Sequence, residues 1–180
     1  DRHISISRAK YQVDYPAGFM LVASMNPCPC GYYNHPTKAC VCPPGAVQKY
    51  LNRISGPLLD RIDIQVEIMP VPFKEMSSDT AGESSASIRA RVVKARHIQQ
   101  LRFKDCKGVH CNAQMNSRLL KTYAALTDEC LDILRQSMER FDMSARAYDR
   151  ILKVARTIAD LDGSPSILPC HIREAVSYRS

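Results

Sequence analysis

The sequence predicts an α/β segment followed by a small all-α domain, and two changes along the chain indicate this. Of the 11 prolines, all but Pro165 and Pro169 lie before residue 73, so helix-breaking residues are concentrated in the first part. Hydrophobic residues form short strand-like runs there, whereas later they follow helical spacing. The 180 residues are 45% hydrophobic and 24% charged. This composition fits a globular protein and excludes a disordered tail, a collagen-like repeat and a coiled-coil rod.

Strand-like runs open the first part. Residues 4–7 and 11–15 alternate between apolar and polar, which predicts a β-hairpin whose tip carries Arg8 and Lys10. The continuous apolar run at 19–25 predicts a strand buried on both faces of a parallel sheet.

A short helix and a further strand complete the first part. The helix is expected from Pro44 to Ile54, because Gly56 and Pro57 stop it. Clean alternation over Ile62–Ile68 predicts the strand. Together these elements make half of an α/β layer, so further strands are expected to precede them.

The second part is predicted to be a helical bundle. Residues 74–87 contain a single large apolar residue and predict a linker. The first helix after it has the apolar stripe Ile88, Val92, Ala95, Ile98 and Leu101. Four more helices follow: one beginning near Ser117, one over 126–138, one over 147–159 that ends at Gly163, and one over 169–178.

Four of the eight cysteines fall in one short loop, as Cys28, Cys30, Cys40 and Cys42. Two close pairs of thiolates can converge on one tetrahedral metal, and zinc is the cation that prefers such ligands. The alternative is a proline-rich loop with free thiols, since the Cys-x-Cys spacing is tighter than in most zinc sites. His35 could replace one thiolate, but it lies between Asn34 and Pro36 and is expected to be exposed.

The other four cysteines give weaker evidence for a metal site. Cys106, Cys111 and the neighbouring His110 could form a second metal site, although ordinary thiols are the better interpretation because only one pair is present. Cys130 and Cys170 are expected to be structural. A low cysteine fraction in a chain that can bury a core fits a reducing, cytoplasmic location.

The formal net charge is +7, and two basic stretches could contact phosphates. Between residues 84 and 104 there are six cations and no acid: Arg89, Arg91, Lys94, Arg96, Arg102 and Lys104. The run could follow a nucleic-acid backbone or be a solvated helix face. Arg146, Arg150 and Lys153 share one side of a later helix, where they either solubilise the helix or reach a phosphate.

Several kinds of site are absent from the sequence. There is no GxxxxGK[ST] loop, no strand ending in paired acids, no HExxH and no GxSxG. The longest apolar run, residues 18–23, is far shorter than the roughly 20 residues of a membrane span. The chain by itself therefore lacks the parts for catalysis.

Three segments in order, residues 19–32, 53–64 and 144–161, resemble the C-terminal portion of a magnesium-chelatase-like AAA+ ATPase of the YifB/ComM group. The resemblance implies that residues 1–73 are the C-terminal part of the AAA+ core and residues 88–180 a helical lid. It also implies a P-loop and Walker B acids before Asp1, so this chain alone is not expected to hydrolyse ATP.

The resemblance assigns roles to single residues. Asn26 resembles the sensor-1 residue that positions the attacking water, and Arg146 resembles the sensor-2 arginine of the lid. Arg61 resembles the arginine finger that a subunit supplies to its neighbour's ATP. The alternative for Arg61 is an ion pair with Asp60 or Asp63. The hairpin resembles one that projects into the pore of related helicases, which makes Arg8 and Lys10 the leading DNA-contact candidates.

The whole protein is therefore expected to be an ATP- and magnesium-dependent motor that assembles as a ring of six subunits in the cytoplasm, without a membrane, and remodels branched DNA. One alternative is a magnesium-chelatase motor subunit that drives metal insertion into a porphyrin. The Cys-Pro-Cys loop favours the DNA motor, because the family resemblance implies that the motor subunit of the chelatase lacks this loop. Another alternative is a non-enzymatic, zinc-stabilised binding module.

Overall fold

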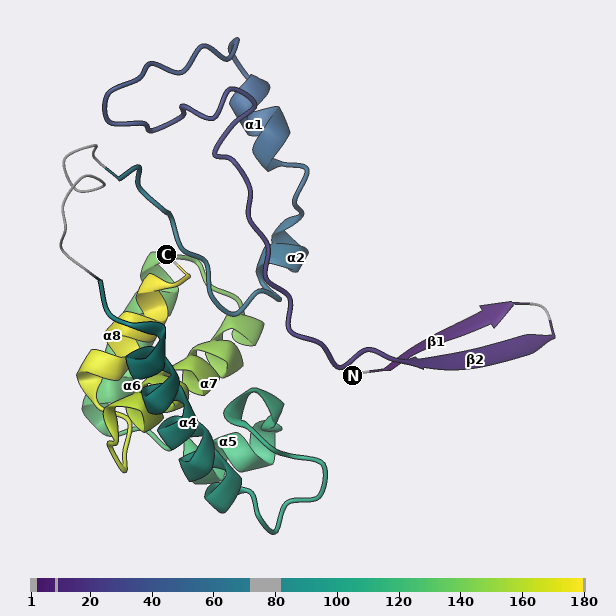
Figure 1. Cartoon of the computed structure of the whole chain (residues 1–180), viewed down its shortest axis with the longest axis vertical. Helices are drawn as coiled ribbons and strands as arrows, with labels where there is room; N and C mark the ends of the chain where they lie inside the picture. The colour runs from purple at the N-terminus through teal and green to yellow at the C-terminus, as the bar shows by residue number, and fades with distance from the viewer. Residues whose placement is uncertain (1–2, 9, 72–81, 180) are drawn as a thin grey trace. The chain divides into compact units, whose positions relative to one another are not determined.

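A computed structural model describes residues 3–8, 10–71 and 82–179 (Figure 1). Contacts between residues divide the chain into two compact units, Asp1–Arg53 and Ile54–Ser180. None of the described helices is long and apolar enough to cross a bilayer.

The first unit begins with the predicted hairpin. Strands β1 (His3–Arg8) and β2 (Tyr11–Pro16) pair antiparallel, with Ile4 opposite Tyr15 and Ile6 opposite Val13. Every residue of both strands is exposed, so neither face of the ribbon is covered within the unit. The hairpin prediction is confirmed, and Arg8 and Lys10 flank its tip.

The strand predicted over residues 19–25 is not formed. This stretch has no regular secondary structure and is exposed, with Met20 85% and Val22 81% accessible. A strand is held by backbone hydrogen bonds to a neighbour, and the sheet formed by the described residues contains β1 and β2 only. The helix expected near residues 44–54 does form, as α1 (Ala46–Leu51).

The second unit begins with the short helix α2 (Gly56–Leu59), which is followed by a stretch without regular secondary structure up to residue 71. The strand predicted over Ile62–Ile68 is also absent. Instead of pairing with another strand, Gln65 donates its backbone N–H to the carbonyl oxygen of Tyr178 at 2.9 Å. The apolar alternation therefore did not produce a strand, because no neighbouring strand pairs with this stretch among the described residues.

All the predicted helices of the second unit are present. They are α4 (Ser85–Arg102), α5 (Ser117–Tyr123), α6 (Asp128–Arg140), α7 (Ala145–Asp162) and α8 (Pro169–Ser177), with a short 3-10 helix η1 (Asn112–Gln114) before α5. Side chains of Ser84, Asn116, Thr127 and Ser144 accept backbone N–H bonds and cap four of them. Gly163 ends α7 with a φ of 74°, a conformation that glycine adopts without strain.

The predicted linker, residues 74–87, is only partly within the described chain. Its residues 74–81 lie outside the described ranges, and its last three belong to α4, which begins at Ser85. The helix therefore starts earlier than its apolar stripe indicated, because the cap at Ser84 sets the boundary.

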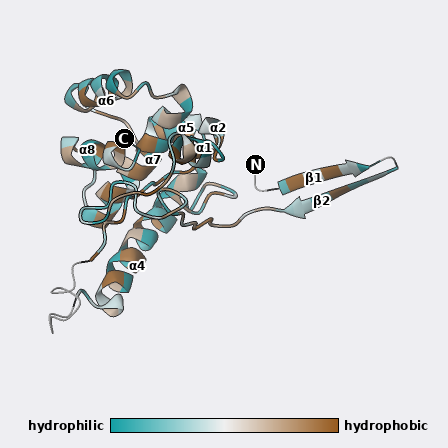
Figure 2. Ribbon diagram, turned by 90° about the horizontal axis from the view of Figure 1, so that it is seen from above, coloured by the Kyte–Doolittle hydropathy of each residue, from teal (hydrophilic) through white to brown (hydrophobic). Residues whose placement is uncertain are grey.

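Helix α7 is the centre of the hydrophobic core. It contacts α4, α5, α8 and η1, and α6 packs on α8. Its predicted apolar face is confirmed by the burial of Ile151, Leu152, Ala155 and Ala159. The predicted stripe of α4 is wrong in part, since Ala95 is buried but Ile88, Val92 and Leu101 are exposed. Figure 2 shows hydrophobic colouring along the α4 ribbon, and three of the apolar residues in its first half, Ile88, Val92 and Val93, are exposed.

Candidate functional site

The four loop cysteines lie together in the first unit. Their sulfur atoms are all within 4.8 Å of one another, and Cys28 is fully buried. The Sγ of Cys28 lies 3.3 Å from that of Cys30 and 3.8 Å from that of Cys40, and the Cys30 and Cys40 sulfurs are 3.5 Å apart. The predicted gathering of these four thiols is confirmed, with no disulfide among them.

Tight turns bring the two pairs together. Gly31 has a φ of 82° and donates its N–H to the Cys28 carbonyl at 3.0 Å, which reverses the chain directly after the first pair. The N–H of Tyr33 points back to the Cys28 sulfur at 3.3 Å. Such backbone N–H donors stabilise negative charge on sulfur.

His35 is not part of the cluster. Its Nδ1 accepts the backbone N–H groups of Thr37 at 3.2 Å and Lys38 at 3.1 Å, and its ring lies edge-on to Tyr32. The ring is half-buried rather than exposed as expected, because it organises the turn between the two cysteine pairs.

The four thiols do not ionise alike. A hydrogen bond from the Tyr32 backbone is the main reason that the pKa of Cys30 falls to about 6. A backbone hydrogen bond involving Cys30 lowers the pKa of Cys42, but burial and the other three thiols together raise it to about 12. Crowded thiolates repel one another, so the cluster can hold four negative sulfurs only when a cation is bound between them.

The remaining cysteines form no second cluster within the described residues. Cys106 packs against the hydrophobic core, and the backbone of His110 donates to Gln114. Cys130 is fully buried, which confirms its structural role. Cys170 is exposed, so its predicted structural role is wrong.

Arg61 is exposed and lies two residues after the last residue of α2, in the second unit. Its Nη1 donates to the Pro57 carbonyl at 2.8 Å, and no ion pair of Arg61 exists within the described part of the chain. The two acids that could have neutralised it are paired elsewhere, Asp60 with Arg179 and Asp63 with Arg150. The alternative predicted for Arg61, an ion pair with a neighbouring acid, is therefore wrong.

The basic side of α7 divides into two kinds of residue. Arg150 pairs with Asp63, and Lys153 donates to the Ala113 carbonyl at 3.2 Å, so both hold the unit together. Arg146, in the first turn, is exposed and has no polar partner among the residues that the structure describes. Of the three, it is the one whose guanidinium is available to a phosphate.

Asn26 is exposed, two residues before Cys28, in a stretch without secondary structure. The strand end that it was expected to occupy is not formed. Its predicted role beside a nucleotide stays a prediction.

The basic run on α4 is less available than its sequence indicated. Arg91 forms an ion pair with Glu83 at 2.8 Å. Arg102 turns inward and donates to Asp160 at 2.7 Å and to Asn112 at 2.8 Å. Arg89, Lys94 and Arg96 are exposed.

A buried polar network surrounds Asp160, and sequence reasoning missed it. Asp160 and Arg156 are 1% and 2% exposed, and Arg156 also donates to the carbonyls of Ser164 and Pro165 at 2.7 and 2.9 Å. No buried side-chain polar atom in the described residues lacks a partner. The signal was present, because Arg156 and Asp160 lie on the buried face of α7, Arg156 one turn after Leu152 and Asp160 directly after Ala159.

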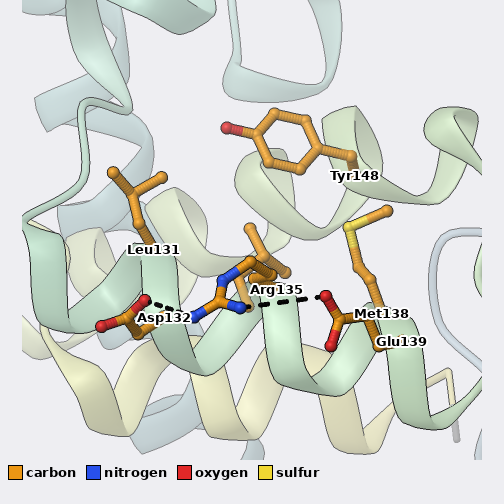
Figure 3. Close-up of a pocket in the computed structure, with 7 residues that line it drawn as sticks. Leu131, Asp132, Arg135, Met138, Glu139 and Tyr148 are labelled. Atoms are coloured by element: carbon orange, nitrogen blue, oxygen red, sulfur yellow. Dashed lines mark hydrogen bonds and ion pairs between the residues drawn. The ribbon is translucent and has the colours of Figure 1, made fainter.

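A groove of about 320 Å³ lies between α6 and α7 and is lined mainly by apolar atoms of Leu131, Leu134, Met138 and Tyr148. Figure 3 shows Arg135 at its edge, paired with Asp132 at 2.9 Å and Glu139 at 3.9 Å. None of the predicted site residues lines it, so it is separate from the nucleotide-contact candidates.

Comparison with known proteins identifies the family. Residues 82–179, more than half of the chain, match the family model "Magnesium chelatase, subunit ChlI C-terminal". Residues 1–76 match "Magnesium chelatase, subunit ChlI". The chain belongs to the magnesium-chelatase-like family. Individual relatives then indicate the YifB/ComM type within it.

The chain is 40% identical to the competence protein ComM of Haemophilus influenzae, over 98% of this chain and 34% of that protein. It is 43% identical to the YifB protein of Escherichia coli and 40% identical to that of Salmonella typhimurium, again over 98% of this chain and 34% of each relative. This magnesium-chelatase-like chain therefore spans about a third of the length of the curated relatives it matches.

The two family models and the two compact units divide this magnesium-chelatase-like chain differently. The first model extends to residue 76, whereas the first compact unit ends at Arg53. Residues 54–71 thus match the first model but pack with the helices that the second model covers. Arg61 lies in this shared stretch.

Proposed function

We propose that this chain is the C-terminal part of an ATP-driven motor of the AAA+ type, in which Arg61 completes the ATP site of a neighbouring subunit. The observation that carries the proposal is the state of Arg61 itself. Its guanidinium is exposed and without an ion pair in the described chain, although an acid lies on either side of it. Membership of the magnesium-chelatase-like family supports the assignment.

The chemistry required of Arg61 is electrostatic. In phosphoryl transfer, negative charge develops on the oxygens of the γ-phosphate, and a guanidinium placed there stabilises it through paired N–H donors. Arg146 would contact the nucleotide from the helical domain, and Asn26 would orient the attacking water. ATP and magnesium are thus the proposed ligands of the whole protein, and a ring, proposed to contain six subunits, is the assembly that lets Arg61 reach a neighbour.

The change Arg61→Ala in the whole protein tests this role. We expect kcat for ATP hydrolysis to fall about 10³-fold, while the Kd for ATP changes little, because the finger acts mainly in the transition state. The change Arg135→Ala removes another exposed arginine of the same unit and should leave both quantities unchanged. Loss of ATP binding in Arg61→Ala would show instead that Arg61 is structural or acts within its own subunit.

The proposed substrate is branched DNA, moved by a cytoplasmic ring. It is supported by the similarity to a competence protein and by the exposed hairpin with Arg8 and Lys10 at its tip. The ATPase rate of the whole protein should rise when a four-way DNA junction is added. If the ATPase rate rises with a metal-free porphyrin and not with the junction, the chelatase alternative replaces the DNA motor.

Zinc is the proposed metal of Cys28, Cys30, Cys40 and Cys42. Zinc–sulfur bonds of about 2.3 Å in a tetrahedron place the sulfurs about 3.8 Å apart, close to the 3.3 to 3.8 Å that separate the sulfurs of Cys28, Cys30 and Cys40. Four thiolates leave no open position, so the ion would be structural and would fasten the two ends of the loop. A zinc-stabilised module without a motor activity is the outcome expected if the ATPase test fails and the metal test succeeds.

A further inference from the structure

The segment that carries Arg61 is held by the helical domain. Arg179, at the end of the described chain, donates to the carbonyls of Ile62 at 2.6 Å and Asp60 at 3.2 Å. Its side chain is 4% exposed and also lies 3.7 Å from the Asp60 carboxylate. A buried arginine whose donors are used on backbone oxygens fixes that backbone in place.

Two more side chains complete the attachment. Ser144 donates from its Oγ to the Asp60 carboxylate at 3.1 Å, and Arg150 forms an ion pair with Asp63. Both lie at the start of α7, Ser144 as its N-cap and Arg150 in its second turn. The residues on each side of Arg61 are thus bound to the helical domain, whereas the Arg61 side chain bonds only to the Pro57 carbonyl among the contacts of the described chain.

The position of the Arg61 guanidinium depends on how firmly the backbone of its segment is held. A guanidinium acts on a transition state only when its position is set beforehand, and a displacement of about 1 Å can reduce a rate about 100-fold. Arg61 has a flexible side chain, so the backbone beneath it must be fixed. Arg179, Ser144 and Arg150 supply this restraint.

We infer that Ser144, Arg150 and Arg179 are positioning residues for Arg61, so that the helical domain sets the placement of the finger. The inference rests on the proposed function of Arg61. Ser144 also caps α7, the helix whose first turn carries Arg146. One helix start therefore supports both arginines that are proposed to contact nucleotide, Arg146 directly and Arg61 through Asp60.

The ion pair between Arg150 and Asp63 offers the sharpest test, because both side chains are partly exposed, at 30% and 49%, and their charges can be exchanged. In the whole protein, Arg150→Asp and Asp63→Arg should each lower kcat for ATP hydrolysis about 10-fold with the KM for ATP within about two-fold. The double exchange should restore kcat to within about three-fold of the original, since the pair re-forms with reversed charge.

The matched control is Arg135→Asp, which breaks an exposed ion pair on α6 without touching the Arg61 segment. It should leave kcat unchanged. Two milder variants, Arg150→Gln and Asp63→Asn, are measured as well. The Tm of every variant then separates misfolding of the chain from misplacement of the Arg61 guanidinium. A positioning role predicts reduced kcat in variants whose Tm equals that of the original protein.

The inference is overturned if folded Arg150→Gln and Asp63→Asn variants keep full kcat, or if the double exchange restores Tm but not kcat. Failure of the proposed function has a different signature: the unaltered protein does not hydrolyse ATP, or Arg61→Ala hydrolyses it normally.

Discussion

Asp160 shows how a single buried charge is accommodated in this chain. It accepts hydrogen bonds from Asn112 at 2.7 Å, from Arg102 at 2.7 Å and from Arg156 at 3.1 Å. The three donors come from α4, η1 and α7 itself. A buried ion pair is weak evidence for stability, but removing one partner leaves the other charges uncompensated.

The change Asp160→Asn should therefore destabilise the chain strongly. We expect the free energy of unfolding to fall by about 3 to 5 kcal/mol, because Arg102 and Arg156 would both lose their anionic partner in the interior. Urea unfolding at neutral pH measures this loss. Asp132→Asn is the control: its ion pair with Arg135 is exposed, so the change should cost less than about 1 kcal/mol. Equal effects of the two changes would contradict this account.

The same carboxylate makes stability depend on pH. Burial by itself would raise the pKa of Asp160, but hydrogen bonds from Arg102 and Asn112 and the charges of both arginines hold it below the ordinary value of 3.8. Asp160 therefore stabilises the fold fully above that value and loses its contribution as the pH falls through the lower pKa of the folded state. The urea concentration at the midpoint of unfolding should decrease as the pH is lowered from about 6 to about 2, and this decrease should be smaller for Asp160→Asn than for the original chain.

Residue-scale prediction from the sequence worked where the signal was local. The four loop cysteines were recognised by spacing alone, and the structure brings them together. Arg102 was assigned to a phosphate-contacting run because its neighbours are basic. Its true partner, Asp160, lies 58 residues away, and no spacing rule reaches that far.

At the scale of elements, the helices and the local hairpin were predictable, whereas the strands expected over residues 19–25 and 62–68 were not formed. An N-cap such as Ser144 and a C-terminal glycine such as Gly163 act within one helical turn, so the bounds of α7 can be predicted from its own residues. A strand needs a partner elsewhere. The β1 and β2 pair formed because its partners are adjacent in sequence, whereas residues 19–25 and 62–68 have no neighbouring strand in the described chain.

The cysteine loop is the element whose order should depend most on a metal. The purified chain should contain about one equivalent of zinc by elemental analysis, and Cys28→Ser should lower this several-fold, since four thiolates are needed to close the site. Cys170→Ser alters an exposed thiol outside the cluster and should not change the zinc content. Zinc well below one equivalent in the unaltered chain, purified without chelator, would remove the proposed metal.

Removal of that zinc by a chelator should affect the two units differently. In its described residues, the first unit has one short helix and an exposed hairpin, so the loop has little other structure to order it. The second unit has its own hydrophobic core around α7. Limited proteolysis after chelation should cut within residues 26–44 while the helical unit stays intact.

At the scale of the whole molecule, the net charge of +7 and the pI near 9.1 favour binding to a polyanion, but charge alone does not say where. Several cations are committed to internal contacts, among them Arg102, Arg150, Arg156 and Arg179. Arg8 and Lys10 lie in an exposed ribbon instead. The positive charge available to a polyanion is thus smaller than the net charge indicates, and part of it lies on the hairpin.

Salt dependence can separate binding at the hairpin from a general attraction. If Arg8 and Lys10 each neutralise one phosphate, changing both to Ala should make the slope of log K against log salt concentration shallower by about 2. The matched control, Arg118→Ala with Lys121→Ala, removes two exposed cations from the helical unit and should leave the slope nearly unchanged. Fluorescence anisotropy with a labelled four-way junction at several salt concentrations measures both. If the two double variants lose the same slope, the chain binds DNA through its net charge, and the hairpin has no special part in binding.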